Sequence, residues 1–309
     1  MPPHTPDFGD PGQLPVKDVP WRPALMCKTT EYRAPHETFS VNFVEDRSLR
    51  IVQKMSRDNW DAGWQPFVFG DVIVRPQDDR GPGPSVDVEV ITNGEGIEVK
   101  TQWSESNQTL VVETPTRISW NDQDHLRPCI QVRITVWVPD EHDPALRNFI
   151  VSAVSLDLKI ADNLVLRVDD TLSLDTVSGN IRGAADGGPP GQPQPPTDFG
   201  LNARFINVET ISGDIQGWWP LYDRLHVASA SGDIRIGVGP QPVLESHPLP
   251  AILEVESVSG NVDISEPIND LIEQGGSRVF GGGSDSLAVR SAVISARSSA
   301  VMCLWSSGL

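Results

Sequence analysis

The 309-residue chain lacks the features that define several common classes of protein. No apolar run approaches the roughly 20 residues that a membrane-spanning helix needs, and the proline-rich start has no apolar core of a signal peptide. Three cysteines cannot all pair with one another, and nothing spaces them as a metal site, so this is not a disulfide-framed secreted domain. Helix signals are rare. Asp143-Pro144 predicts a short turn through Phe149, Pro267 to Gln274 predicts another, and the remainder predicts an all-β chain.

Positive charge is also scarce. The chain has 24 lysines and arginines against 42 aspartates and glutamates, a formal net charge of −18. Nucleic acids and anionic membranes attract proteins through a basic footprint, so this balance argues against both as partners. A simpler role for the charge is to keep a β protein with many strand edges in solution.

Catalytic signatures are missing as well. The chain holds no Gly-x-Ser-x-Gly element, no glycine-rich phosphate loop and no zinc motif. The segment 140–143 gathers three carboxylates and an imidazole, but prolines on both sides indicate a solvated loop, and the segment 122–125 is a weaker candidate. We therefore predict no catalytic, cofactor-binding or metal-binding residue, and no cofactor.

The second half of the chain contains a repeated phrase. Ser-Gly-Asn-Ile begins at Ser178, Ser-Gly-Asp-Ile at Ser212 and Ser231, and Ser-Gly-Asn-Val at Ser259. Counted from each serine, aliphatic residues return at positions −6, −4 and +3, and a hydroxyl returns at −2. Such a repeat predicts a stacked fold in which similar units contact their neighbours. The columns are Leu172, Ile206, Leu225, Leu253 at −6; Leu174, Val208, Val227, Val255 at −4; Thr176, Thr210, Ser229, Ser257 at −2; Ile181, Ile215, Ile234, Val262 at +3.

Each copy predicts a strand, a tight corner and a second strand. The alternation before the serine is typical of a strand with one buried face. Before the serine the aliphatic residues occupy even positions, whereas after it they occupy an odd one, so the corner must accommodate one extra residue. We expect the glycine at +1 to do this with a positive φ, and the Asn or Asp at +2 to serve the turn rather than a metal. We expect the hydroxyls at −2 to form a hydrogen-bonded ladder.

The spacing of the copies predicts loops and further copies. The serines lie 34, 19 and 28 residues apart (212 − 178, 231 − 212 and 259 − 231), which predicts a bare unit of about 19 residues with proline-rich insertions at 186–200 and 239–250. A degraded copy is predicted upstream, with Gly94 in the serine position. A half-copy is predicted downstream, with Leu287, Val289 and Ser291 at −6, −4 and −2.

The Ser-Gly-Asp/Asn-Ile/Val repeat, preceded by an aliphatic-x-aliphatic-x-hydroxyl strand, resembles the "putative adhesin" domains of unknown function, a β-solenoid family. The match covers 88–291 and is clearest over 172–264. The resemblance implies an all-β, single-domain β-solenoid, similar to a parallel β-helix, with a surface role and no assigned catalytic residues. Larger members often carry a membrane anchor, which this chain does not show. The resemblance thus favours the cell surface, whereas a chain complete at Met1 would be cytoplasmic.

We expect three segments along the chain. Residues 1–36 are rich in proline and are expected to be disordered. Residues 37–302 are expected to form the β-solenoid domain. Residues 303–309 are expected to form a tail. The stretch 302–305 is a poor polar cap for a stacked fold, which suggests a truncated end, and the alternative is an apolar segment that packs over the last coil.

Trp218, Trp219 and Tyr222 are the predicted contact site. The tryptophan pair precedes a proline, outside the inward columns, in what we expect to be a connecting loop. Exposed side-by-side aromatics suit a sugar ring or a protein partner, and the alternative is packing over a neighbouring loop.

Two functions follow from these observations. The leading one is a non-enzymatic, adhesin-like module that presents loops from a rigid β-solenoid to a carbohydrate, a protein or another copy of itself. The alternative is a carbohydrate-active enzyme, a polysaccharide lyase or hydrolase, on a parallel β-helix with scattered carboxylates. A cleft with two convergent carboxylates and a tryptophan platform would favour the enzyme.

Overall fold

A computed structural model describes residues 32–56, 63–77, 83–120, 127–139, 144–162, 164–184, 200–241 and 251–265, and the backbone of 293–298. Within these residues the regular structure is β, apart from one 3-10 turn at Glu105–Asn107 (η2). None of the described residues forms a helix that could cross a membrane. The chain is therefore all-β, as predicted.

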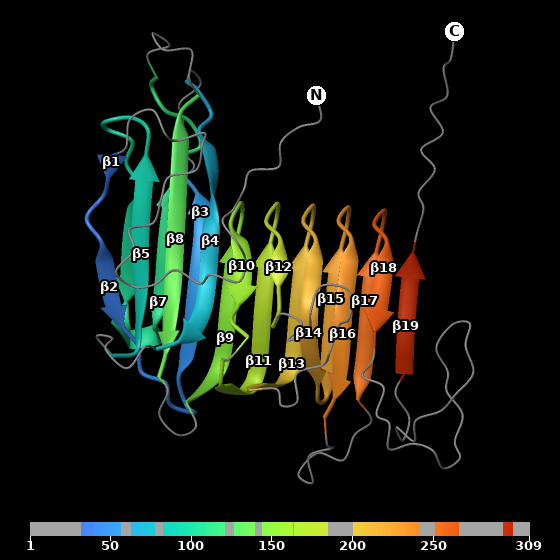
Figure 1. Cartoon of the computed structure of the whole chain (residues 1–309). Coiled ribbons are helices and arrows are strands. Elements are labelled where there is room, and N and C mark those ends of the chain that lie inside the picture. Colours follow the sequence, from blue (N-terminus) through green and yellow to red (C-terminus); the bar gives the residue numbers. More distant parts are fainter. Residues whose placement is uncertain are drawn as a thin grey trace, which may run out of the picture.

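The strands form two mixed sheets, A and B (Figure 1). Sheet A has the order β1 (Tyr32–Arg33), β5 (Ser85–Thr92), β8 (Cys129–Val138), β4 (Phe67–Pro76), β10 (Asp157–Ile160), β12 (Ile181–Arg182), β14 (Ile215–Leu221), β16 (Ile234–Pro240), β18 (Val262–Ser265), and β2 (Glu37–Ser40) also pairs with β5. Sheet B has the order β19 (Val293–Ser298), β17 (Ile252–Ser257), β15 (Arg224–Ser229), β13 (Leu201–Thr210), β11 (Leu166–Thr176), β9 (Ala145–Ala153), β3 (Ser48–Met55), β7 (Thr109–Thr114), β6 (Lys100–Ser104).

From β9 onwards, successive strands alternate between the two sheets. β9 lies in sheet B, β10 in sheet A, β11 in sheet B, and so on to β19. Neighbours within each sheet run parallel in this region. We call each pair of strands, together with the corner that joins them, a coil. Each coil thus adds one strand to each sheet (Figure 1).

The register confirms the predicted inward columns. In sheet B, Leu174 pairs with Val208, which pairs with Val227, which pairs with Val255, and each is at most 1% exposed. In sheet A, the column runs through Ile181, Ile215, Ile234 and Val262. The prediction that Val262 is buried in this column is wrong. This residue is 38% exposed, because β18 ends the described path of sheet A.

The corner glycines do not have the positive φ that we expected. The positive-φ glycines of the described residues lie elsewhere, for example Gly70 and Gly217. At Gly213 a Cβ would lie 1.8 Å from the carbonyl oxygen of Gly179, and at Gly232 it would lie 1.8 Å from that of Gly213. Glycine is required at +1 because each corner presses directly on the corner of the preceding coil.

The hydroxyls at −2 bond to these same corners. The hydroxyl of Thr210 accepts the N–H of Gly213 at 3.0 Å and donates to the carbonyl of Gly179, in the preceding coil, at 3.2 Å. Ser229 accepts the N–H of Gly232 at 2.9 Å and donates to Gly213 at 3.2 Å. The predicted ladder is confirmed for Thr176, Thr210 and Ser229, whose hydroxyls donate to a carbonyl of the preceding coil. Ser257 departs from it, because its hydroxyl donates to the carbonyl of Gly260 in its own coil at 3.2 Å.

The Asn and Asp column at +2 forms a second ladder. Asn180 Oδ1 accepts the N–H of Asp214, Asp214 Oδ1 accepts that of Asp233, and Asp233 Oδ1 accepts that of Asn261, each at 2.9 Å. The bond from the Asn261 N–H is the main reason that the pKa of Asp233 lies below its usual value. These side chains therefore link neighbouring coils.

Of the two further copies that we predicted, the upstream one is wrong and the downstream one stays a prediction. The copy at Gly94 falls on β5, which runs antiparallel to β8 and lies outside the alternating series. The half-copy at 287–291 lies outside the described residues, and the strand that continues sheet B is β19. It places Ile294, Ala296 and Ser298 at positions −6, −4 and −2.

One coil lies where the sequence predicted a helical turn. The segment through Phe149 is β9, and Phe149, Val151 and Ala153 pair with the −6, −4 and −2 residues of β11. Asp157 begins the +2 ladder, because its Oδ1 accepts the N–H of Asn180 at 2.8 Å.

The other end of the molecule departs from chain order. β3 lies between β9 and β7 in sheet B, and β4 lies between β10 and β8 in sheet A. Antiparallel β5 and β6 continue the two sheets beyond β8 and β7. β1 lies inside the predicted segment 1–36, and the segment limits themselves stay predictions because residues 1–31 and 299–309 are not among those described.

The contact between corners makes a testable prediction. Gly213→Ala should destabilise the protein by about 1–3 kcal/mol or more, because the new methyl group overlaps a backbone oxygen that cannot move alone. Urea denaturation measures the loss. Ile211→Ala, two residues away and 56% exposed in the wild type, is the control and should change little. Equal stability of the two variants would contradict the close approach.

Candidate functional site

The two tryptophans of the predicted contact site are buried in the structure. Trp218 and Trp219 lie in strand β14, not in a loop, and are 2% and 0% exposed. Tyr222 follows the strand and is partly exposed. Ligand contact by these three residues stays a prediction, and the burial of the pair gives it no support.

Glycines in neighbouring coils explain why both tryptophans are buried. A Cβ on Gly237 of β16 would lie 2.2 Å from the indole of Trp218, and one on Gly183 would lie 2.8 Å from the indole of Trp219. Trp219 packs in the core between the sheets. The missing side chains of these two glycines therefore leave the space that the two indoles occupy.

No metal site is found among the residues that the structure describes, as judged by groups of three or more His, Cys, Asp or Glu side chains. The segments 122–125 and 140–143 lie outside those residues. Cys129 is buried and disulfide-bonded.

A buried ion cluster on sheet A joins three strands. Asp71 of β4 accepts hydrogen bonds from Arg133 of β8, at 2.9 and 3.2 Å, and from Lys159 of β10, at 3.1 Å. Burial alone would raise the pKa of Asp71, but the two cations outweigh it and the pKa is lowered. The carboxylate is fully engaged in holding the strands together.

The candidate site is a shallow groove of about 670 Å³ on the outer face of sheet B. It crosses the corner ends of five strands, β9, β11, β13, β15 and β17. Positions −3 to −1 of the coils line it, as residues 152–153, 175–177, 209–211, 228–230 and 256–258.

Two rows of outward side chains form the surface of the groove. The row at −1 is aliphatic, and Val177, Ile211 and Val258 are 41%, 56% and 47% exposed. The row at −3 is acidic, with Asp175, Glu209 and Glu256. The coil between Ile211 and Val258 has alanine in both rows, as Ala228 and Ala230. None of the described residues that line the groove is a lysine or arginine.

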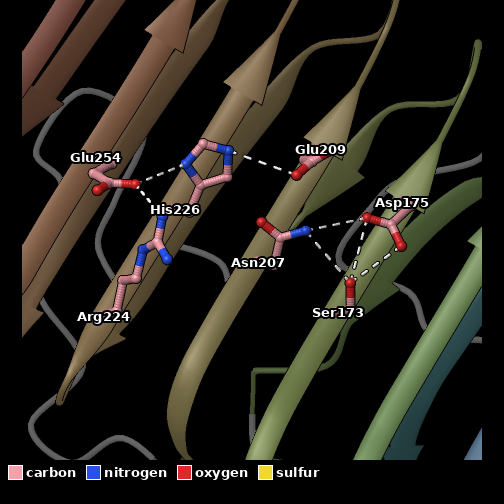
Figure 2. A network of polar contacts seen from close by, with 7 residues as sticks. All are labelled: Ser173, Asp175, Asn207, Glu209, Arg224, His226 and Glu254. Carbon is pink, nitrogen blue, oxygen red and sulfur yellow. Dashed lines mark hydrogen bonds and ion pairs between the residues drawn. The ribbon is translucent and has the colours of Figure 1, made fainter.

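A network of polar side chains borders the groove (Figure 2). His226 lies between two carboxylates, with Nε2 at 3.6 Å from Glu209 Oε1 and Nδ1 at 3.4 Å from Glu254 Oε2. Arg224 donates to Glu254 at 2.5 Å, and this bond is the main cause that lowers the pKa of Glu254. The nearby cation is thus already paired with a carboxylate outside the groove.

Asp175 has a different environment. Ser173 Oγ donates to it at 3.1 Å and Asn207 Nδ2 at 3.4 Å. Ser173 and Asp175 lie on β11 and Asn207 on the adjacent β13 (Figure 2). Burial raises the pKa of Asp175, and the charge of Glu209 raises it further. Within the described residues the hydrogen bonds to Asp175 come from neutral donors, so its negative charge is not compensated there.

The sequence carries a signal for this groove, although the predicted contact site did not include it. Positions −3 and −1 point outward, yet three of four copies have Val or Ile at −1. An aliphatic residue in the outward phase of a strand, returning at a fixed offset, predicts an exposed apolar row.

Comparisons with known proteins give only remote likenesses. No family model matches the chain, and no curated protein matches it in sequence. One similar structure is a "putative cell adhesion protein" from Clostridium sporogenes, with 8% identity and a TM-score of 0.34, covering 75% of this chain and 99% of that one. A "putative adhesin" from Parabacteroides distasonis has 14% identity and a TM-score of 0.29, with 87% and 94% covered. Another, from Parabacteroides merdae, has 10% identity and a TM-score of 0.25, with 89% and 97% covered.

The environment of Asp175 predicts a stabilising substitution. A carboxyl group whose pKa is raised by folding destabilises the folded state when it is ionised. This loss of folding free energy is absent below the unfolded pKa, near 3.8, and complete above the folded pKa. Asp175→Asn keeps the neutral hydrogen bonds and should raise the melting temperature at pH 7 but not at pH 3. Asp263→Asn, at an exposed site in β18, is the control. A lower melting temperature for Asp175→Asn at pH 7 would contradict this assignment.

Proposed function

We propose that the chain is a non-enzymatic, adhesin-like interaction module, a β-solenoid that binds a partner through the groove on sheet B. The observation that carries the proposal is that different positions of the repeat have different roles. The polar residues that recur bond to the neighbouring coil, whereas the outward positions −3 and −1 form the groove.

The solenoid is supported by the alternation of strands between the sheets. Each coil from β9 onwards contributes one strand to each sheet, and the hydroxyl and Asn/Asp ladders join one coil to the next. Such a scaffold stacks similar units and presents an extended surface, which is the typical use of repeat folds in binding.

The interaction role is supported by the exposed aliphatic row. Apolar side chains that gather on a surface, instead of being scattered singly, are typical of contact sites between molecules. The enzyme alternative has less support. The described residues that line the groove include carboxylates but no aromatic side chain to hold a sugar ring, and Trp218 and Trp219 are buried outside the groove.

A location at the cell surface is part of the proposal. The disulfide bond at Cys129 supports it, because disulfides persist in oxidising surroundings such as the cell exterior and are rare in the cytosol. The resemblance of the repeat to adhesin-like domains points in the same direction.

The test is adhesion by protein-coated beads. Beads that carry the chain are mixed with one another and with cells of the organism that makes it, and bound beads are counted. Ile211→Ser with Val258→Ser, 56% and 47% exposed, should reduce adhesion at least tenfold. Val165→Ser with Val44→Ser, 54% and 47% exposed and outside the groove, is the matched control and should leave adhesion unchanged.

Thermal melting of both double variants checks that each is folded, since exposed aliphatics contribute little to stability. Wild-type beads that adhere to neither target, or groove and control variants that adhere equally well, would contradict the proposed function.

A further inference from the structure

We propose that the groove on sheet B receives a basic amphipathic helix of about 13 residues from a partner protein, with an aliphatic stripe beside a lysine- or arginine-rich stripe. This proposal rests on the proposed function and names the chemistry of the partner. Three features of the groove support it: the arrangement of its two rows, its length and its charge.

The two rows lie side by side and cross the strands. Within a row, neighbouring positions are one strand spacing apart, about 4.8 Å. The rows at −3 and −1 are two residues apart along each strand, about 7 Å. The surface therefore offers one aliphatic stripe, through Ile211 and Val258, and one anionic stripe, through Asp175, Glu209 and Glu256, in parallel.

A helix matches this arrangement and an extended strand does not. Residues three and four apart on a helix form a stripe that advances about 5.4 Å per turn, close to the spacing of about 4.8 Å between neighbouring positions within a row. A second stripe lies beside the first on the same face of the helix. In a strand, alternate side chains point to opposite faces, so a segment with alternating cations and aliphatics would present only one kind to the groove.

The length follows from the strands crossed. The groove extends from β9 to β17, across five strands of sheet B and four intervals between them. Four intervals of about 4.8 Å give about 19 Å, which a helix of about 13 residues spans at 1.5 Å per residue.

The charge of the groove selects a basic partner. Asp175 has only neutral hydrogen-bond donors among the described residues, and Glu209 contacts His226 at 3.6 Å. Arg224 is already bonded to Glu254. Burial is the main cause that raises the pKa of Asp175, and the neighbouring charge of Glu209 raises this pKa further. Cations placed along the −3 row would be attracted by these carboxylates and would strengthen binding at low salt.

The middle of the groove provides room for a large side chain. Ala228 and Ala230 stand where the neighbouring coils have Glu209 with Ile211 and Glu256 with Val258. A leucine-sized side chain of the helix can therefore pack over this coil, between two larger aliphatics.

The test uses three synthetic peptides of 13 residues with capped ends. The first arranges leucine and lysine in two adjacent helical stripes, the second has the same composition in scrambled order, and the third replaces lysine by glutamate. Fluorescence anisotropy with the full chain measures the Kd of each at 50 and 300 mM NaCl. The striped lysine peptide should bind at least tenfold more tightly than the other two, and its affinity should fall with added salt.

Variants of the full chain locate the binding. Ile211→Ser with Val258→Ser should weaken the striped peptide at least tenfold, Glu209→Gln should weaken it and reduce the salt dependence, and Val165→Ser with Val44→Ser should have no effect. Equal affinity for the striped and scrambled peptides would show charge attraction alone and overturn the proposal.

The outcomes separate the two proposals. If bead adhesion depends on the groove but no helical peptide binds, the helix is the wrong partner and the proposed function stands. If the striped peptide binds at the groove but bead adhesion does not depend on it, the recognition of a helix is right and the adhesion role is wrong.

Discussion

The structure depends on the close approach of one corner to the next. At each glycine of the repeat, the carbonyl oxygen of the preceding coil occupies the place where a Cβ would be, 1.8 Å away in the case of Gly213. This approach brings the −2 hydroxyl within reach of that same carbonyl and the +2 side chain within reach of the next N–H. The backbone groups of the corners, which a turn would otherwise expose to water, are thereby bonded between coils.

The same constraint separates structural residues from those available for function. The recurring residues are tied to these roles: Ser212 and Asp214 bond to a neighbouring coil, as do the −2 hydroxyls of Thr210 and Ser229, and the glycines lie against the carbonyl of the preceding coil. Positions −3 and −1 face outward and are free of that requirement. The exposed aliphatics and carboxylates of the groove occur at these two positions, so the repeat itself builds a continuous surface on sheet B.

Much of the fold could be predicted from the sequence, because the inward columns repeat without exception from Leu174 to Val255. The coil at β9 and β10 could not, since Ala153 and Leu156 stand where the other coils have a hydroxyl and glycine. Gln53 of β3 replaces part of the ladder there, and its Oε1 accepts the N–H groups of Val154 and Ser155 at 2.6 and 3.2 Å. The burial of the tryptophan pair could not be predicted either, because the space for it comes from Gly183 and Gly237, which lie in other coils and leave no local signal.

Amide hydrogen exchange of the corner residues tests the central claim, that the recurring polar side chains hold the coils together. The variant Asp214→Ala removes the acceptor of the Asp233 N–H, a bond of 2.9 Å, while Asp233 itself still accepts the N–H of Asn261. Exchange at Asp233 should accelerate at least tenfold, as expected for the loss of a bond worth about 1.4 kcal/mol, and exchange at Asn261 should change much less. An unchanged exchange rate at Asp233, in a variant that remains folded, would contradict the ladder and with it the separation of structural from functional positions.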